Sequence, residues 1–159
     1  MSNFQIFGLQ FTVSLFVYAL IARWYVAPRL AALPLRDALT PLLLLHSMRH
    51  LGMTFLVTVV VSPEVPRTFA TQVAYGDLLA LGLALLSIAA LRARLGFAIL
   101  VVWIFNIVGF VDLLNAFYQG TQLDVSRYQL GPGWFIPTFA VPALIVTHVM
   151  IFSMLLKRH

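Results

Sequence analysis

Three side chains that can bind a ligand or carry a proton interrupt a long apolar segment of this chain. They are His46, Arg49 and His50, and they lie within residues 40–61, a stretch long enough to cross a bilayer as an α-helix, which takes about 20 residues. On an α-helix, residues 46 and 50 lie one turn apart and residue 49 lies beside them, so the three side chains are expected on one face. A guanidinium that faces lipid is unfavourable by at least about 2.5 kcal/mol, so this face is predicted to point into the protein.

The other apolar segments contain polar residues that can meet this face, namely Asp77, Asn106, Asp112, Asn115 and His148. Counting about 1.5 Å per residue from the segment ends puts Asp77 and Asp112 within about 5–8 Å of the level of Arg49, which is within the reach of an ion pair. The eight residues together form the predicted ligand-binding site.

Arg49 has two interpretations. Its charge and the carboxylates of Asp77 and Asp112 can serve only to fix how helices pack. Alternatively, the fork of guanidinium N–H donors holds an anionic or carbonyl group of a ligand. Substitution by lysine separates the two, because a fork contact suffers while a bare charge balance survives.

The histidines raise the question of a cofactor. His46 and His50 have the four-residue spacing that lets two imidazoles reach one divalent metal, and His148 can supply a third ligand. Haem b needs only two histidines facing each other, and His148 with either of the others meets that condition. The alternative is that each imidazole donates one hydrogen bond and fills space. The chain has no cysteine, which excludes thiolate ligands and thiol nucleophiles, and the pattern assigns no catalytic residue.

Composition identifies the class of protein. Hydrophobic residues make up 62% of the sequence and charged residues 9%, and the mean hydropathy is +0.97, values that predict an all-α integral membrane protein. The net charge of +5 does not indicate nucleic-acid binding, because the basic residues are scattered at the ends of apolar segments.

The apolar segments predict one domain, a bundle of five transmembrane helices over residues 4–26, 40–61, 72–91, 97–118 and 134–156. An external N-terminus puts seven Arg and Lys residues on the cytoplasmic side and only Arg67 and Arg127 on the other. The C-terminus is then cytoplasmic, and we expect the protein in a bacterial inner membrane.

Two features concern packing. Gly76, Ala80 and Ala84 form a ridge of small residues that lets another backbone approach, within the chain or in a homo-oligomer. Pro137 and Pro142 break the last span near His148, as binding cavities in membrane proteins often require.

Three function classes follow. The first is a binding module, or a carrier, for a small amphipathic ligand whose polar end lies at Arg49 and the histidines and whose body contacts Met53, Phe105, Phe110 and Phe139. The second is a redox or hydrolytic enzyme with haem or a metal at His46, His50 and His148. The third is an accessory or assembly subunit of a membrane complex, in which the buried polar groups only specify packing.

Overall fold

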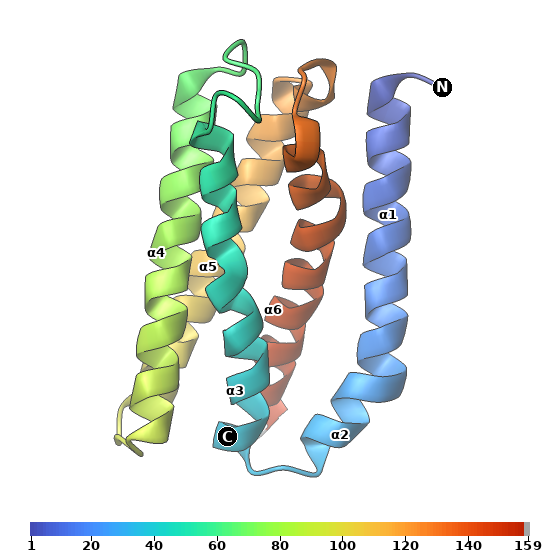
Figure 1. Cartoon of the computed structure of the whole chain (residues 1–159). Helices are drawn as coiled ribbons and strands as arrows, with labels where there is room; N and C mark the ends of the chain where they lie inside the picture. Colours follow the sequence, from blue (N-terminus) through green and yellow to red (C-terminus); the bar gives the residue numbers. More distant parts are fainter. Residues whose placement is uncertain (158–159) are drawn as a thin grey trace.

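The computed structural model describes residues 1–157, and all regular secondary structure in this range is helical. The helices join end to end into long rods that run side by side (Figure 1). In chain order the rods are α1 (Asn3–Ile21) with η1 (Ala22–Val26) and α2 (Ala27–Ala31), α3 (Leu35–His46) with η2 (Ser47–Leu56), α4 (Arg67–Arg92), α5 (Ala98–Gln122), and η4 (Gly131–Trp134) with η5 (Ile136–Ala140) and α6 (Val141–Lys157). A short turn, η3 (Val125–Arg127), lies between α5 and η4.

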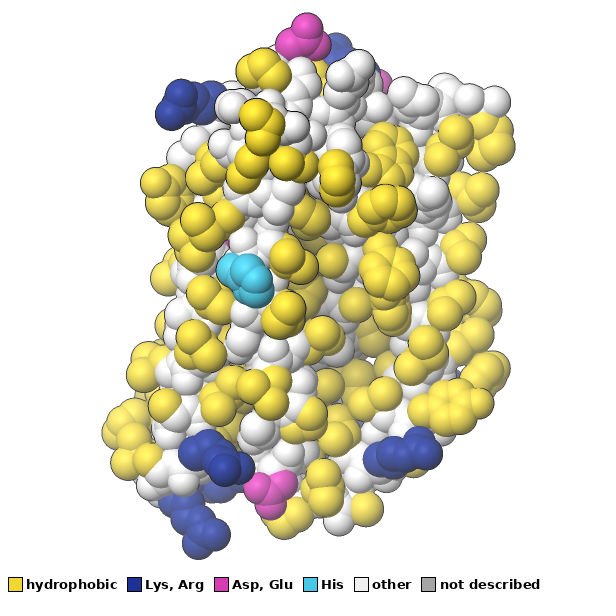
Figure 2. All heavy atoms as spheres, viewed as in Figure 1, with side chains coloured by type: hydrophobic (Ala, Val, Ile, Leu, Met, Phe, Trp, Pro, Cys, Tyr) yellow, Lys and Arg dark blue, Asp and Glu magenta, His cyan; other side chains and the backbone are white. Residues whose placement is uncertain are grey.

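Four of these rods are long and apolar enough to cross a membrane: Asn3–Ala31, Arg67–Arg92, Ala98–Gln122 and Gly131–Lys157. Hydrophobic side chains cover the space-filling surface between two ends where the Lys, Arg, Asp and Glu side chains gather (Figure 2). The rod formed by α3 and η2 is long enough but not as apolar, because His46, Arg49 and His50 make its middle polar. Four of the five expected spans are therefore supported by their length and apolar composition.

The rod that carries Arg49 differs from the single α-helix expected over residues 40–61. It begins earlier, at Leu35 after Pro34, and it ends at Leu56, where Val57 has an extended backbone. Its second half, η2, is a 3₁₀ helix, which has three residues per turn instead of 3.6. The buried positions follow this change of period: in α3 they are Ala38, Leu39, Leu42, Leu43 and His46, and in η2 they are Arg49, Gly52 and Phe55.

The other expected spans are helical, and the rods extend beyond the expected boundaries except at the start of α5, which begins at Ala98 instead of residue 97. The first continues past residue 26 to Ala31, through the π-helical turn η1 and the short α2, which has Pro28 in its first turn. The last rod has a second π-helical turn, η5, around Pro137. A proline has no N–H to donate within a helix, and wider turns of this kind let the chain continue as a helix on either side.

The buried side chains form two apolar clusters with a polar layer between them. We use this name for His46, Arg49, Asp77, Asn106, Asp112 and His148. One cluster lies where α3, α4, α5 and α6 meet near Leu39 and Phe105, and the other lies near the opposite end, around Phe55 and Phe69. Ala80 and Ala84 of the small-residue ridge are fully buried within the chain, so this ridge serves internal packing. In contrast, only 6% of the apolar stretch within the first rod is buried. Helix α1 stands at the edge of the bundle (Figure 1).

Candidate functional site

Arg49 is the centre of the polar layer and joins three helical elements. Its Nε donates to Oδ1 of Asp77 on α4 at 2.6 Å, and its Nη2 donates to Oδ2 of Asp112 on α5 at 2.5 Å. The remaining terminal nitrogen, Nη1, donates to the backbone carbonyl of Gly109 on α5 at 3.0 Å. The ion pair expected from the sequence is therefore formed, and it involves both carboxylates at once.

Two glycines make room for these carboxylates. A Cβ on Gly52 in η2 would overlap the carboxylate of Asp77, and a Cβ on Gly76 in α4 would overlap that of Asp112. Any side chain at either position would force a carboxylate or the backbone to move. Each helix thus approaches the next closely at a glycine, and each gap is filled by an aspartate from the neighbouring rod.

A second pair of contacts joins α5 to α6. Asn106 and His148 are both fully buried, and the amide nitrogen of Asn106 donates to the backbone carbonyl of His148 at 3.2 Å. The Oδ1 of Asn106 therefore faces Nδ1 of His148, 2.7 Å away, and this nitrogen must carry the proton because an amide oxygen can only accept. The Nε2 of His148 then carries the lone pair of the neutral ring, and it has no hydrogen-bond partner in the described part of the chain.

His46 lies directly against His148. The centroids of the two imidazole rings are 4.1 Å apart, and both rings contact Phe105. Nε2 of His46 is 3.0 Å from the hydroxyl of Thr147 on α6, and Nδ1 of His46 has no partner among residues 1–157. The histidine pair therefore continues the polar layer from Arg49 toward the cytoplasmic end expected from the sequence.

Two of the eight predicted site residues lie outside this layer, and these expectations are wrong. His50 is exposed, with Nδ1 3.3 Å from the carbonyl of Ser47, because a 3₁₀ helix turns residue 50 away from the row that contains residues 46 and 49. Asn115 is also exposed, and its carbonyl accepts from Gln119, which donates to Gln72 as well. The other six residues are brought together: His46, Arg49, Asp77, Asn106, Asp112 and His148.

The geometry does not support a metal or haem at the histidines. His50 cannot join His46 and His148 on one metal because it points outward, and within residues 1–157 no three His, Asp or Glu side chains are grouped as metal ligands would be. Bis-histidine haem requires an iron porphyrin between the two rings. The rings of His46 and His148 are in contact instead, and both side chains are fully buried.

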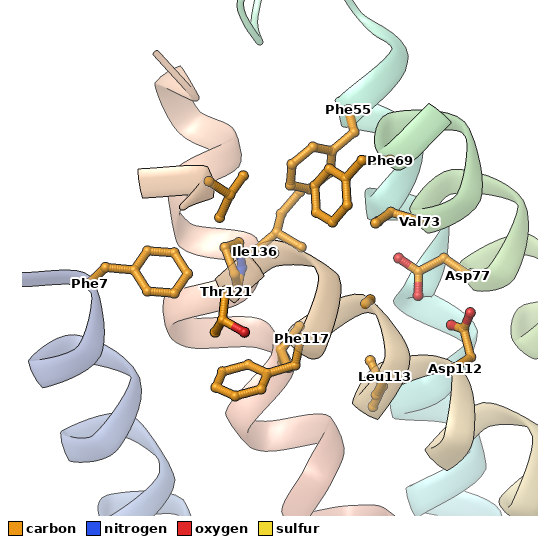
Figure 3. A pocket seen from close by; sticks show the side chains of 15 residues that line it. Phe7, Phe55, Phe69, Val73, Asp77, Asp112, Leu113, Phe117, Thr121 and Ile136 are labelled. Atoms are coloured by element: carbon orange, nitrogen blue, oxygen red, sulfur yellow. The ribbon is translucent and has the colours of Figure 1, made fainter. Parts of the chain in front are cut away.

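A cavity of about 60 Å³ is lined at one end by the two aspartates, and neither His46 nor His148 lines it (Figure 3). Apart from Asp77, Asp112 and Thr121, its walls are formed by apolar side chains and Gly120, including the rings of Phe7, Phe55, Phe69 and Phe117. In the close-up, Asp77 and Asp112 lie side by side at one end, and Phe7 reaches in from α1 at the other (Figure 3). None of the four residues expected around the body of the ligand lines this cavity, namely Met53, Phe105, Phe110 and Phe139.

Access to the charged groups is unequal. The side chain of Arg49 is fully buried, while 10% of the Asp77 side chain and 20% of the Asp112 side chain remain exposed. Each carboxylate gives one oxygen to Arg49 and keeps the other, Oδ2 of Asp77 and Oδ1 of Asp112, without a hydrogen bond in the described residues. These free oxygens lie against the glycines of the neighbouring helices, Oδ2 of Asp77 against Gly52 and Oδ1 of Asp112 against Gly76. Asp77 and Asp112 line the cavity, whereas Arg49 does not.

The sequence analysis missed Gly52, Gly109 and the rings that line the cavity, and it named Gly76 only as part of the small-residue ridge. Gly52 lies three residues after Arg49, and Gly76 lies directly before Asp77, so small residues beside buried charges were the available signal. Gly109 is a third example, because a Cβ there would lie about 3.1 Å from both Nη1 of Arg49 and Nε2 of His148. Nothing in the sequence pattern points to Phe7, because the cavity depends on how α1 packs.

Comparison with known proteins gives a family but no function. The model of a domain of unknown function, DUF8737, matches residues 6–156, and the chain belongs to this family. No curated protein and no solved structure matches the chain.

Proposed function

We propose that this member of the DUF8737 family is an integral membrane protein that binds a small amphipathic ligand in the cavity beside Arg49, Asp77 and Asp112. The observation that carries the proposal is an apolar cavity that ends on two carboxylates in the middle of the bundle. A mostly apolar pocket with a few convergent polar groups is the usual form of a small-molecule site.

The position of the carboxylates supports a site inside the membrane. Asp77 lies ten residues after the start of α4 at Arg67, and Asp112 lies ten residues before the end of α5 at Gln122. At about 1.5 Å per residue, both carboxylates lie about 15 Å from the same end of the bundle, which is half the thickness of a bilayer core of about 30 Å. A charged cluster at that depth is rare in membrane proteins and is usually functional.

The proposal includes a fifth span, formed by α3 and η2. The rod has 12 α-helical and 10 3₁₀ residues, which at about 1.5 and 2.0 Å per residue give a length of about 38 Å. This exceeds the bilayer core, and the polar side chains His46 and Arg49 are turned inward. With five spans, the excess of Arg and Lys favours an external N-terminus and a cytoplasmic C-terminus, as in a bacterial inner membrane.

Retention of a ligand through purification tests the proposal. Ala116 of α5 lines the cavity, and Ala116→Leu is expected to fill it, while the same change at the exposed Ala89 of α4 leaves the cavity open. We expect native mass spectrometry to find a small molecule bound to the wild type and to Ala89→Leu, and to find it lost from Ala116→Leu. Circular dichroism checks that all three proteins are folded.

Two results would contradict the proposal. One is a wild-type protein that, purified from its own membrane, carries no small molecule. The other is equal retention by Ala116→Leu, which would mean that any bound molecule lies outside this cavity. A protein that is stable only with a partner chain would favour an accessory subunit instead.

A further inference from the structure

We infer that the groove between the first rod and α6 binds an anionic phospholipid, with the phosphate at Arg23 and Lys157 and an acyl chain along the groove. The walls of the groove come from residues 15–31 of the first rod and residues 145–157 of α6. This site goes beyond the proposed function, because the groove and the cavity beside Asp77 and Asp112 have no lining residue in common.

The groove is large and open to the lipid. Its volume is about 740 Å³, several times that of an engineered cavity of about 150 Å³ that takes benzene. Ala19, Ala22 and Ala27 line it from the first rod, which stands at the edge of the bundle, and Met150 and Met154 line it from α6 (Figure 1). Because Ala19 and Ala27 are exposed within a membrane-spanning rod, the groove is accessible to acyl chains.

Three polar side chains line the groove, and two of them are cations. Arg23 belongs to η1, Lys157 is the last residue of α6, and Ser153 lies one turn before Lys157. The other eleven lining residues are apolar, so the described part of the groove contains no carboxylate. Arg23 and Lys157 are exposed, and neither side chain has a hydrogen bond or an ion pair within residues 1–157. The groove therefore offers two positive charges that no described residue balances.

The depth of the two cations suits a lipid headgroup. Lys157 lies at the end of its rod, and Arg23 lies eight residues before Ala31, the end of the first rod, which is about 12 Å along a helix. A long arginine side chain reaches the headgroup level while its methylene groups stay in the apolar region. With the N-terminus outside, this end of the bundle meets the cytoplasmic leaflet, where anionic lipids give a negative surface potential.

The chemistry of the groove favours an anionic phospholipid over other occupants. A guanidinium forms paired hydrogen bonds with phosphate, an ammonium adds a point charge, and the Ser153 hydroxyl can donate a further hydrogen bond. A zwitterionic lipid carries its own cation, so the two protein cations would leave a positive excess. A water-soluble anion would leave the apolar walls unfilled. Basic pockets between membrane helices at the cytoplasmic side are known to bind anionic headgroups.

Two phospholipids with identical acyl chains test the headgroup charge. We would add an equimolar mixture of phosphatidylglycerol, which has one net negative charge, and phosphatidylcholine, which has none, to the full-length protein in detergent. Native mass spectrometry then counts the bound lipids of each kind. We expect phosphatidylglycerol to be bound about tenfold or more in excess, because each basic residue near the headgroups favours an anionic lipid about fivefold.

Variants connect this preference to the groove. Arg23→Gln and Lys157→Gln should each lower phosphatidylglycerol binding by about fivefold. Arg92→Gln removes an exposed cation at the same end of the bundle but outside the groove, and it should leave binding unchanged. Ala19→Phe keeps both cations and fills the groove, so it should also lower binding, with Ala89→Phe at an exposed position of α4 as its control. Circular dichroism checks that each variant is folded.

Equal binding of the two phospholipids would overturn the inference. Equal phosphatidylglycerol binding by Arg23→Gln and Arg92→Gln would also overturn it, because general attraction to a basic end would then be sufficient. Unchanged binding by Ala19→Phe would place the lipid outside the groove. Ala116→Leu changes the cavity and not the groove, so we expect it to keep the preference, and loss of the preference in this variant would place the lipid in the cavity instead.

Discussion

Arg49 holds three helical elements together through three different acceptors. It reaches the carboxylates of Asp77 and Asp112 and the carbonyl of Gly109 with three separate nitrogens. A lysine ammonium is a point charge on a flexible stem and cannot match this fork of donors, although it preserves the charge. This geometry fits the packing interpretation of Arg49, because all three nitrogens donate to acceptors of the protein itself and Arg49 does not line the cavity.

Removing this charge should destabilise the protein strongly. Arg49→Gln leaves two buried carboxylates without a cation, and we expect a loss of about 3–5 kcal/mol in the free energy of unfolding, with Arg49→Lys intermediate. Adding Asp77→Asn and Asp112→Asn to Arg49→Gln removes the unpaired charges and should restore much of the stability. Denaturant unfolding in lipid bicelles measures the series. An Arg49→Gln protein as stable as the wild type would mean that the ion pairs contribute nothing.

The glycines beside the aspartates predict a position-specific effect. Gly52→Ala introduces a Cβ where the Asp77 carboxylate lies, so overpacking should lower the free energy of unfolding by about 1–3 kcal/mol. Gly82→Ala on α4 is the matched control, because a Cβ there has no neighbour within 4 Å and alanine is the better helix former. We expect thermal unfolding to separate the two variants, and equal melting temperatures would refute the close approach at Gly52.

Of the eight site residues predicted from the sequence, six lie in the polar layer. The signal was physical, because an ionisable side chain in an apolar segment must find a partner. The two misses have local causes: His50 depends on the helix type of η2, and Asn115 depends on the face that α5 turns outward. The size and lining of the cavity depend on packing between rods that are distant in the sequence, and no local pattern encodes this.

At the scale of elements, the change from α3 to η2 decides which side chains face the bundle. A uniform α-helix would bring residue 50 to the same side as residue 46, whereas the 3₁₀ helix aligns Arg49 with Gly52 and Phe55. A uniform period of 3.6 residues per turn predicts both the inward orientation of His50, which is wrong, and the metal triad that depends on it. Helix existence was predictable because long apolar runs in a membrane have few alternatives to helix.

The two histidines at the junction should therefore respond differently to the same substitution. His50→Leu replaces an exposed imidazole by an apolar side chain, and we expect unchanged or slightly higher stability. His46→Leu removes the contact with Thr147 at a fully buried position, so a loss of about 1 kcal/mol or more is expected. Thermal unfolding of both variants in nanodiscs makes the comparison. A larger loss for His50→Leu would indicate that residue 50 faces the protein interior after all.

At the scale of the whole molecule, the arrangement of rods leaves α1 as the weakly packed wall of the cavity. Helix α1 contacts the rest of the bundle through aromatic rings. The ring centroids of Phe7 and Trp134 are 5.4 Å apart, and those of Phe11 and Phe117 are 4.8 Å apart. The other rods meet around the polar layer and are more extensively buried. We therefore expect that widening the cavity costs less free energy beside α1 than between α4 and α5, which the Arg49 cluster joins.

The number of spans is a property of the whole molecule and can be tested with single cysteines, since the chain has none of its own. Asp37 lies in the first turn of α3, Glu64 lies in the loop between η2 and α4, and both are exposed. If this rod crosses the membrane with the N-terminus outside, a membrane-impermeant maleimide applied to intact cells should label Glu64→Cys, and it should label Asp37→Cys only after the membrane is opened. Ser2→Cys serves as a second external position. Labelling of both Asp37→Cys and Glu64→Cys from the same side would show that only the four strongly apolar rods span the bilayer. The rod that carries Arg49 would then not cross the membrane.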